Sequence, residues 1–265
     1  MITELLHKIS NISMRSQKIT DDIILIRLKI VNACIIDTPK GWFLIDTGME
    51  NAAGFIIEVA EKHFGKGTVP KAIILTHGHF DHIGSIIQLT NYWNVPVYAH
   101  KLELPYLIGE KDYPQGNPDA GGGIVSLMSS SFPHSAIDIS HHIHPLPDDG
   151  SIPDMNDWRW IHTPGHSPGH ISLFRDRDRT LIVGDAFSTV QQESLSSVLS
   201  QDKKISGPPA YLTIDWKSAQ ESVSKLKDLS PSLAITSHGM PIEGNELNKF
   251  LDQLVSNFEQ IAILK

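Results

Sequence analysis

Hydrophobic and polar positions divide this chain into two groups of predicted strands, each followed by predicted helices. Short apolar runs rich in β-branched residues predict strands over 23–28, 31–37, 42–45, 72–75 and 95–99, and later over 158–162, 170–174, 180–183 and 233–236. Apolar side chains at helical spacing predict helices over 51–64, from near 82 to about 90, over 216–229 and from about 243 to 263. This mixed pattern predicts an α+β fold.

Length and spacing favour one large domain. A chain of 265 residues with 40% hydrophobic content can bury a substantial core. No stretch resembles a flexible linker, so we expect a single domain over residues 1–265, with two small domains as the alternative. Residues 102–149 lack a clear period and contain "YPQGNPDAGGG". We expect this segment to be a substrate-pocket or lid insertion, with Gly121–Gly123 as a candidate hinge.

The net charge and the cysteine content restrict the classes of partner and the cellular compartment that we expect. Lys and Arg number 22 against 30 Asp and Glu, a formal net charge of -8, which disfavours nucleic acid as a partner. Cys34, the single cysteine, excludes an internal disulfide and favours a reducing compartment. The opening residues lack the apolar core of a secretory signal, and no stretch approaches the ~20 apolar residues of a membrane span. We therefore expect a cytoplasmic protein that acts on a small molecule and has no membrane partner. Its oligomeric state is left open.

Candidate chemistry appears where the predicted strand 72–75 ends, in "THGHFDHIG". His77, His79, Asp81 and His82 fall within six positions there. Residues two apart point about 200° from each other in a helix, so His77 and His79 could not share a ligand on one, and we expect the cluster to lie on a loop. The alternative is a polar surface loop. Neutral imidazole and carboxylate are ligands that suit zinc, iron or manganese.

Three later segments repeat the local arrangement of an apolar strand followed by a ligand-capable residue beside glycine. They are "IHTPGHSPGH", with His162, His166 and His170; "LIVGDAF", with Asp185; and "LAITSHGMPI", with His238. Each alone has an ordinary alternative, a turn histidine or a capping aspartate. Together with the first cluster they indicate a metal centre assembled from distant parts of the chain.

The order and spacing of these motifs, from "WFLIDTG" to "SHGMP", resemble the metallo-β-lactamase superfamily of metal-dependent hydrolases, over most of the chain. The resemblance implies an αβ/βα four-layer sandwich with two metals in a cleft at one edge of its two sheets. By matching motif positions, it implies that one metal is bound by His77, His79 and His166, the other by Asp81, His82 and His238, and that Asp185 bridges them.

Other polar residues receive different interpretations. Asp46 matches the first motif of the family, which implies that it supports a ligand or the ligand loop; an ordinary turn aspartate is the alternative. His162 and His170 do not match ligand positions, and we expect them to pack on a strand or to lie in the cleft. A further group in "SHHIHP" matches no family motif, and an exposed strand or loop is expected there: His141, His142 and His144.

Two divalent ions a few ångströms apart can lower the pKa of a bridging water towards ~7 and present hydroxide to an electrophile. We expect zinc, with iron or manganese as alternatives, and Asp81 as the catalytic residue that orients the nucleophile or moves a proton. The expected substrate is a small ester, lactone or thioester. Quorum-quenching lactonases carry a tyrosine where this chain has Ser188, and glyoxalase II has more chain after the last ligand than the 27 residues beyond His238.

Other reaction classes are retained as alternatives. Persulfide dioxygenases resemble this chain in length and motifs but use a single iron. A phosphodiesterase or nuclease is disfavoured by the acidic composition. A non-enzymatic binding module is disfavoured because all seven ligand-type residues are present.

Overall fold

The computed structural model describes residues 14–28 and 30–263, which form two compact units. Among the described residues, the first unit comprises those up to Tyr113 together with Pro133–Leu146. The second comprises Pro114–Phe132 and the residues from Pro147 onward. The expectation of no secretory signal falls largely on residues 1–13, outside the described part of the chain. The prediction of a single domain over the whole chain stays a prediction.

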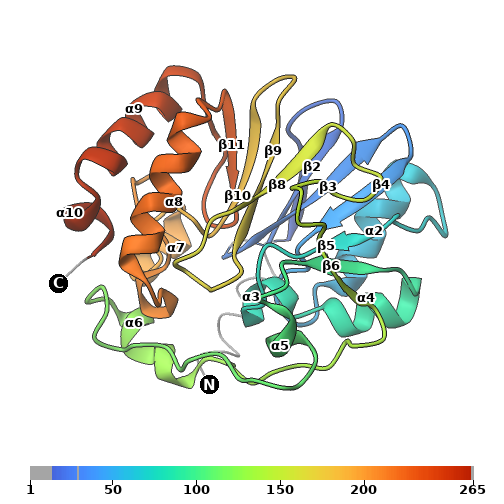
Figure 1. Cartoon of the computed structure of the whole chain (residues 1–265), viewed down its shortest axis with the longest axis horizontal. Helices are drawn as coiled ribbons and strands as arrows, with labels where there is room; N and C mark the ends of the chain where they lie inside the picture. The colour runs from blue at the N-terminus through green and yellow to red at the C-terminus, as the bar shows by residue number, and fades with distance from the viewer. Residues whose placement is uncertain (1–13, 29, 264–265) are drawn as a thin grey trace. The chain divides into compact units, whose positions relative to one another are not determined.

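The first unit is built on a seven-stranded sheet in sequential order (Figure 1). Its strands are β1 (Arg15–Lys18), β2 (Ile23–Arg27), β3 (Asn32–Thr38), β4 (Gly41–Ile45), β5 (Ile73–Ile74), β6 (Val97–Ala99) and β7 (Ile143–Pro145). Neighbours from β1 to β4 are antiparallel, and neighbours from β4 to β7 are parallel. All five side chains of β2 are buried, as expected for a strand covered on both faces.

Among its described residues, this unit has the helices α2 (Ala53–Phe64), α3 (Phe80–Ile83), α4 (Ile86–Trp93) and α5 (Leu104–Leu107). The sequence predicted one helix from near His82, whereas the structure has two, α3 and α4. The interruption has a local cause. Ser85 Oγ donates to Met49 O at 2.7 Å and accepts from Ala52 N at 2.9 Å, so this residue is tied to another loop.

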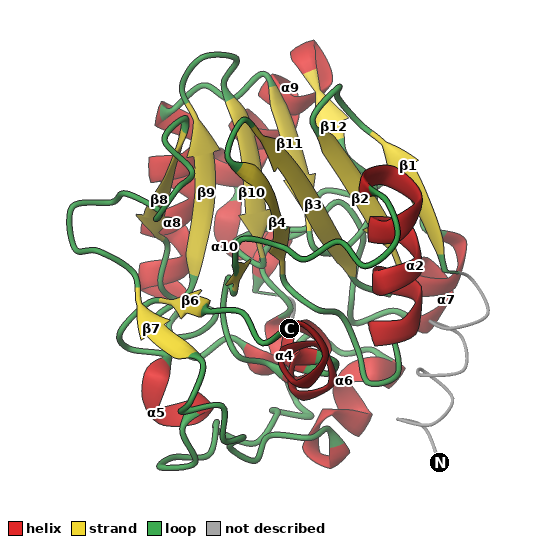
Figure 2. Ribbon diagram, turned by 90° about the vertical axis from the view of Figure 1, so that its right-hand side faces the viewer, coloured by secondary structure: helices red, strands yellow, loops and turns green. Residues whose placement is uncertain are grey.

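The second unit contains a five-stranded sheet in the order β12-β11-β10-β9-β8, which can be followed in Figure 2. Its strands are β8 (Trp158–His162), β9 (Ile171–Arg175), β10 (Thr180–Gly184), β11 (Leu233–Thr236) and β12 (Ile242–Glu243). Only β10 and β11 pair in parallel; the other neighbours are antiparallel. The carboxyl ends of β10 and β11 therefore lie side by side, which places Asp185 and His238 near each other.

The second unit also contains helices, the last three of which pack on its sheet through one apolar cluster. They are α6 (Ile124–Met128), α7 (Leu195–Ser200), α8 (Trp216–Asp228), α9 (Gly244–Ser256) and α10 (Phe258–Ala262), with 3-10 turns over Ser129–Ser131 and Ala210–Leu212. Side chains of β8–β12 and α8–α10 share a buried core. Figure 1 shows α8, α9 and α10 on one side of the strands of this sheet. The Asp215 side chain caps α8 by accepting from Ser218 N at 3.0 Å. The predicted closing helix is interrupted at Asn257, between α9 and α10.

Several short elements were not predicted from the sequence: β1, β7, α5, α6 and α7. Each is only three to six residues long, too short to show a period. Residues 102–149 are shared between the two units. In the described ranges 14–28 and 30–263, no helix combines the length and apolar content needed to cross a bilayer.

Candidate metal centre

The carboxyl ends of β4 and β5 place the first group of polar side chains. These strands are parallel neighbours, so the segments that leave them run side by side. β4 leads directly to Asp46, whose backbone N donates to Ile74 O at 2.9 Å. β5 leads through Thr76 to His77. Asp46, Thr76 and His77 are all buried, so their polar atoms need partners within the protein.

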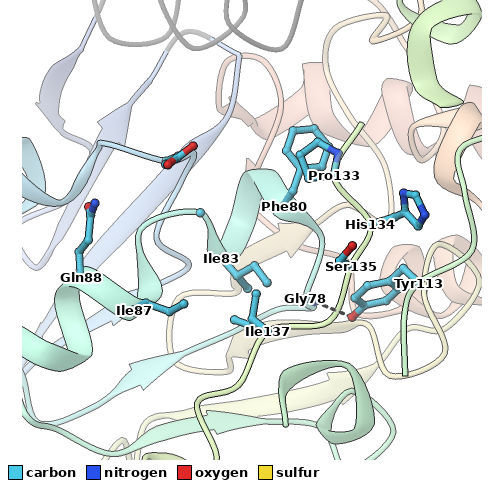
Figure 3. Close-up of a pocket in the computed structure, with 12 residues that line it drawn as sticks. Gly78, Phe80, Ile83, Ile87, Gln88, Tyr113, Pro133, His134, Ser135 and Ile137 are labelled. Carbon is cyan, nitrogen blue, oxygen red and sulfur yellow. Dashed lines mark hydrogen bonds between the residues drawn. The ribbon is translucent and has the colours of Figure 1, made fainter. Parts of the chain in front are cut away.

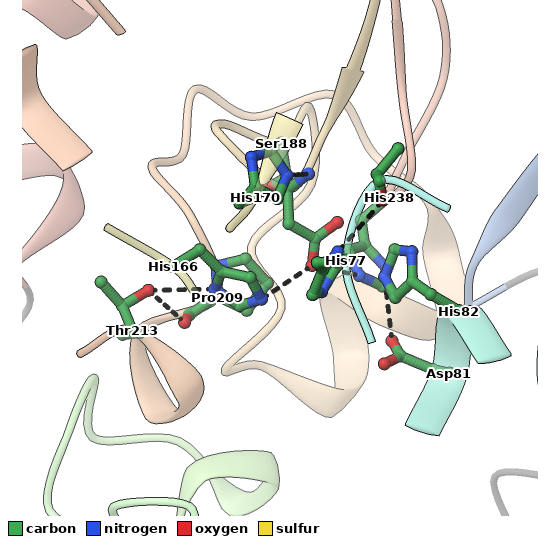
Figure 4. Close-up of polar contacts among 12 residues, drawn as sticks. His77, Asp81, His82, His166, His170, Ser188, Pro209, Thr213 and His238 are labelled. Carbon is green, nitrogen blue, oxygen red and sulfur yellow. Dashed lines mark hydrogen bonds and ion pairs between the residues drawn. The ribbon is translucent and has the colours of Figure 1, made fainter. Parts of the chain in front are cut away.

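Three buried histidines converge beyond β5. The ring centroid of His77 lies 4.6 Å from that of His79 and 4.1 Å from that of His82. Asp81 adds a carboxylate, with Oδ2 3.8 Å from His82 Nε2 (Figure 4). The prediction that all four donors lie on a loop is wrong for two of them. Asp81 and His82 belong to the short helix α3, while His77 and His79 precede it.

Asp46 fixes the orientation of His82. Its Oδ2 lies 2.9 Å from His82 Nδ1, and both side chains are almost fully buried. Because a carboxylate accepts, it holds the proton on Nδ1 and assigns the lone pair to Nε2. A hydrogen bond of this kind sets the ring orientation of metal-ligating histidines. This is the supporting role that the resemblance implied for Asp46.

Thr76 extends the same arrangement to His77. The Thr76 hydroxyl donates to Asp46 Oδ2 at 2.8 Å, and Asp46 Oδ1 accepts from Thr76 N at 2.8 Å. His77 Nδ1 lies 3.1 Å from Thr76 Oγ1. Since the hydroxyl proton goes to Asp46, the hydroxyl oxygen accepts from His77 Nδ1–H. The lone pair of His77 is therefore on Nε2, as it is in His82.

The loop after β4 also holds α3 by its backbone. His82 O accepts from Thr47 N at 2.7 Å and from Thr47 Oγ1 at 2.8 Å. Gly84 N donates to Gly48 O at 2.8 Å. A Cβ at Gly84 would lie 2.3 Å from Glu50 N, so this close approach requires glycine. The two segments thus form one rigid support for Asp81 and His82.

Gly78, between His77 and His79, is held by two buried side chains. Its N–H is shared between Glu103 Oε2 and Tyr113 Oη, each at 3.0 Å. The Tyr113 hydroxyl in turn donates to Glu103. Burial, reinforced by the Glu103 carboxylate, raises the pKa of Tyr113 well above its ordinary value, so the phenol keeps its proton. Gly78 is not at positive φ. It is required because a Cβ would lie 2.6 Å from Tyr113 Oη.

The second group of donors lies in the second unit, at the ends of β10 and β11 and in the turn after β8. Asp185 Oδ2 lies 3.3 Å from His166 Nε2 and 3.2 Å from His238 Nε2 (Figure 4). All three side chains are at most 3% exposed. One carboxylate oxygen therefore faces two imidazole nitrogens in a buried environment.

The tautomer of His166 shows what its contact with Asp185 requires. Its Nδ1 lies 3.2 Å from Thr213 Oγ1, and that hydroxyl donates to Pro209 O at 2.8 Å (Figure 4). The threonine oxygen therefore accepts from His166 Nδ1–H, which assigns the lone pair to Nε2. A lone pair and a carboxylate oxygen 3.3 Å apart repel unless a proton or a metal cation lies between them.

His170 supports Asp185 and is not placed as a ligand. Asp185 N donates to His170 Nε2 at 2.7 Å, while His170 Nδ1 lies 3.0 Å from Thr163 O. Both ring nitrogens are thus used within the backbone frame of β8–β10. His162 Nε2 contacts Pro168 O at 2.9 Å. The packing roles expected for His162 and His170 agree with these contacts.

The remaining sequence candidates lie in ordinary surroundings. His144 is exposed in β7, with its ring near that of Tyr98. In the preceding turn His141 is exposed and His142 is partly buried, so the expectation of a strand or loop at the surface is confirmed. The buried Ser188 hydroxyl donates to Val190 O at 2.8 Å.

Sequence reasoning missed four residues that orient or hold these donors: Thr76, Thr213, Glu103 and Tyr113. Thr76 directly precedes His77, and that adjacency was a usable signal. The other three contact their partners from 25 to 47 positions away, with no local motif.

Both donor groups have the chemistry of a divalent metal site. In His77, His82 and His166, Nδ1 donates to an oxygen, so that each presents an Nε2 lone pair. Carboxylates stand beside these nitrogens in each unit, at Asp81 and Asp185. Imidazole with carboxylate suits zinc, iron and manganese, so the residues fit the divalent ions that the resemblance implies.

Comparison with known proteins agrees with this chemistry. Residues 26–238 match the family described as the metallo-beta-lactamase superfamily. The chain is 47% identical over 237 residues to the probable metallo-hydrolase YflN of Bacillus subtilis (strain 168), covering 88% of this chain and 90% of YflN. It is 27% identical over 160 residues to the hydroxyacylglutathione hydrolase GloC of Haemophilus influenzae, covering 57% of this chain and 63% of GloC.

Solved structures show the same fold. TTHA1623 in a di-iron-bound form is 26% identical, with a TM-score of 0.56, and the match covers 80% of this chain and 89% of that one. A motif mutant of a metallo-β-lactamase from Cronobacter sakazakii is 16% identical, with a TM-score of 0.64 over 93% of this chain and 96% of that one. The predicted α+β fold of the metallo-β-lactamase type is confirmed. The family model matches most of the sequence, and His and Asp side chains that could hold metal ions are grouped in the structure. This chain therefore belongs to the metallo-β-lactamase superfamily and is a metallo-hydrolase.

Proposed function

We propose that this chain is a dinuclear hydrolase that cleaves a small ester, lactone or thioester. The observation that carries the proposal is the shared orientation of the histidines: in each unit an Nδ1–H is held by a threonine or aspartate oxygen, so the Nε2 lone pairs are preset for metal ions. The proposed ligands are His77, His79, Asp81, His82, His166, Asp185 and His238. Divalent ions held by these residues would supply an activated water and a Lewis acid for the substrate carbonyl.

The residues of the chain have distinct proposed tasks. Asp46 and Thr76 hold His82 and His77 in the ligating tautomer, and Thr213 does the same for His166. Asp81, with a side chain 13% exposed, is the proposed catalytic carboxylate that accepts a proton from the attacking water and returns it to the leaving group. No serine or cysteine nucleophile is needed for this chemistry.

Substrate class and metal are proposed from the comparisons and the composition. The name of GloC is that of a thioester hydrolase, which supports an acyl-transfer substrate. We propose zinc as the native metal; the di-iron form of TTHA1623 makes iron the competing choice. We also propose a cytoplasmic location, because a single cysteine favours a reducing compartment. We propose a small-molecule substrate without a nucleic-acid partner, because the net charge is -8, and without a membrane partner, because no stretch has the apolar length of a span.

Metal analysis joined to an activity panel tests the proposal. We expect the full chain, purified without added metal, to contain two divalent ions and to hydrolyse esters, lactones or thioesters. Removal of the metal with a chelator should abolish activity, and zinc should restore it. His79→Ala and Asp185→Asn should lower both metal content and activity, whereas His144→Ala at an exposed histidine should not. One iron per chain, with oxygen consumed on glutathione persulfide, would instead establish a dioxygenase.

A further inference from the structure

A cavity of about 400 Å³ lies in the first unit (Figure 3), and its lining includes Gly78 and Phe80 of the segment that carries His77, His79, Asp81 and His82. All of its lining residues belong to that one unit. Its volume falls within the range of about 300–1,000 Å³ found for small-molecule sites. No step of the proposed hydrolysis uses it.

The cavity shares its wall with the ligand segment. Gly78 and Phe80 line it and lie between His77, His79 and Asp81 along the chain, so the cavity and the donors share one short stretch of backbone. Tyr113 also lines the cavity, and its ring centroid lies 4.7 Å from that of His79. A substrate whose reacting group meets these donors can therefore extend into the cavity.

The lining is mainly apolar and comes from three places. Phe80 and Ile83 belong to α3, Ile87 to α4, and Pro133 and Ile137 to the segment after residue 132. Ile87 is 46% exposed, although it faces this cavity. A large apolar side chain left in contact with water beside a concave apolar surface marks a place where an apolar group can bind.

The charged side chains that line the cavity restrict which apolar groups it can bind. Glu50 is the acidic residue among those that line the cavity, and it is exposed; His134 also lines the cavity, whereas no Lys or Arg does. A negatively charged tail would be repelled by this carboxylate and would find no lysine or arginine to pair with. The cavity therefore favours an uncharged chain.

We propose that this cavity binds the aliphatic acyl chain of the substrate, with the reacting carbonyl at the donors of the ligand segment. The proposal rests on the proposed function, and it selects within the substrate classes named there. The acyl part is common to esters, lactones and thioesters, so one pocket serves all three. Uncharged aliphatic acyl groups are preferred over those that end in a carboxylate.

The first test measures kcat/KM for a series of p-nitrophenyl esters with straight acyl chains from acetyl to octanoyl. Each methylene buried should raise kcat/KM about fourfold until the cavity is filled. Ile137→Trp, which fills the cavity, should remove most of this rise, so that the octanoyl-to-acetyl ratio falls. The same change at Ile214, an isoleucine 47% exposed in the second unit, is the matched control and should keep the ratio.

A second measurement separates this proposal from the proposed function. Isothermal titration with hexanamide, a neutral acyl chain, should show binding to the full chain and weaker binding to Ile137→Trp. If hexanamide does not bind, or if the ester series shows no dependence on chain length, the cavity is not an acyl site. Binding that is intact while no ester, lactone or thioester is hydrolysed would overturn only the hydrolase assignment.

Glu50→Gln tests the charge argument and does not depend on filling the cavity. Esters that end in a carboxylate should be poor substrates of the unchanged chain. They should improve about tenfold in the variant relative to uncharged esters of equal length, a gain that falls as salt is added. Equal discrimination in both proteins would show that Glu50 does not select the acyl chain. Should Ile137→Trp fail to fold, Ile87→Glu at an exposed position replaces it.

Discussion

The carboxylate of Asp46 lies 2.9 Å from Nδ1 of His82, although 36 positions separate the two residues in sequence. The contact exists because the loop after β4 and the helix α3 are joined by backbone hydrogen bonds. It sets the tautomer of a proposed metal ligand. Asp46 is held at a φ of 57°, a conformation that Asp and Asn adopt more readily than most residues.

Asp46→Asn should therefore weaken metal binding without breaking the loop. The amide tolerates the same backbone conformation but loses the negative charge that accepts from His82 Nδ1–H. We expect metal affinity to fall about 10- to 100-fold, as is usual when such a supporting group is changed. Competition with a chromophoric chelator measures it. Asp37→Asn, at an exposed aspartate of β3, is the control; equal metal affinity of Asp46→Asn and the unchanged chain would contradict the assigned role.

The contacts around Gly78 predict a compensating pair of substitutions. Gly78→Ala should be destabilising because its Cβ would lie 2.6 Å from Tyr113 Oη. Tyr113→Phe removes that oxygen, so the double variant should lose less stability than the sum of the single changes. Urea denaturation of the four proteins measures the coupling. Strict additivity would show that the Tyr113 hydroxyl does not constrain the ligand segment.

Glu103→Ala should cost about 1–3 kcal/mol of unfolding free energy, because the buried N–H of Gly78 and the hydroxyl of Tyr113 lose a shared acceptor. Glu103→Gln keeps an acceptor oxygen and should recover part of that loss. Urea denaturation checks both values. The reverse order, with Gln less stable than Ala, would contradict the hydrogen-bonding role.

His170→Phe should loosen the end of β10, since the buried Asp185 N–H loses its acceptor. The expected cost is about 1–3 kcal/mol of unfolding free energy, with a loss of metal content because Asp185 is displaced. Denaturation and elemental analysis of the same preparation measure both effects. His162→Phe, at a partly exposed histidine, is the control and should retain its metal.

Glu193 predicts a pH effect on stability. Burial raises the pKa of Glu193, although the Ala210 N–H, 2.8 Å from its Oε1, acts in the opposite direction. With the folded pKa above the unfolded value of about 4.3, the folded chain binds more protons between the two. The contribution of Glu193 to stability therefore declines as pH rises through that interval.

Glu193→Gln lacks this titration, so its unfolding free energy should improve relative to the unchanged chain as pH rises above the unfolded pKa of about 4.3. Denaturant unfolding at several pH values measures the difference. Glu221→Gln, at an exposed glutamate of α8, is the control. A difference between Glu193→Gln and the unchanged chain that does not vary with pH would contradict the direction of the shift.

The sequence predicted most of the long elements because their patterns are local. β8 and β11 match the predicted ranges, and α8 ends within one residue of its predicted end. The single helix predicted from near His82 is wrong because Ser85 hydrogen bonds to Met49 and Ala52, which no local pattern reveals. The glycines Gly121 and Gly123, considered as a hinge, pack closely against Glu193, so a Cβ at Gly123 would lie 1.9 Å from its carbonyl oxygen.

The candidate donors could be read from the sequence because they fall in compact motifs that follow apolar strands, and the resemblance of those motifs to the family implies which of them bind metal. The residues that hold those ligands in place could be identified only from the tertiary structure. Thr213 meets His166 across 47 positions, and Glu103 reaches Gly78 across 25, because strand and loop packing brings them together. A hydrogen bond depends on distance and direction in space, and sequence separation carries neither.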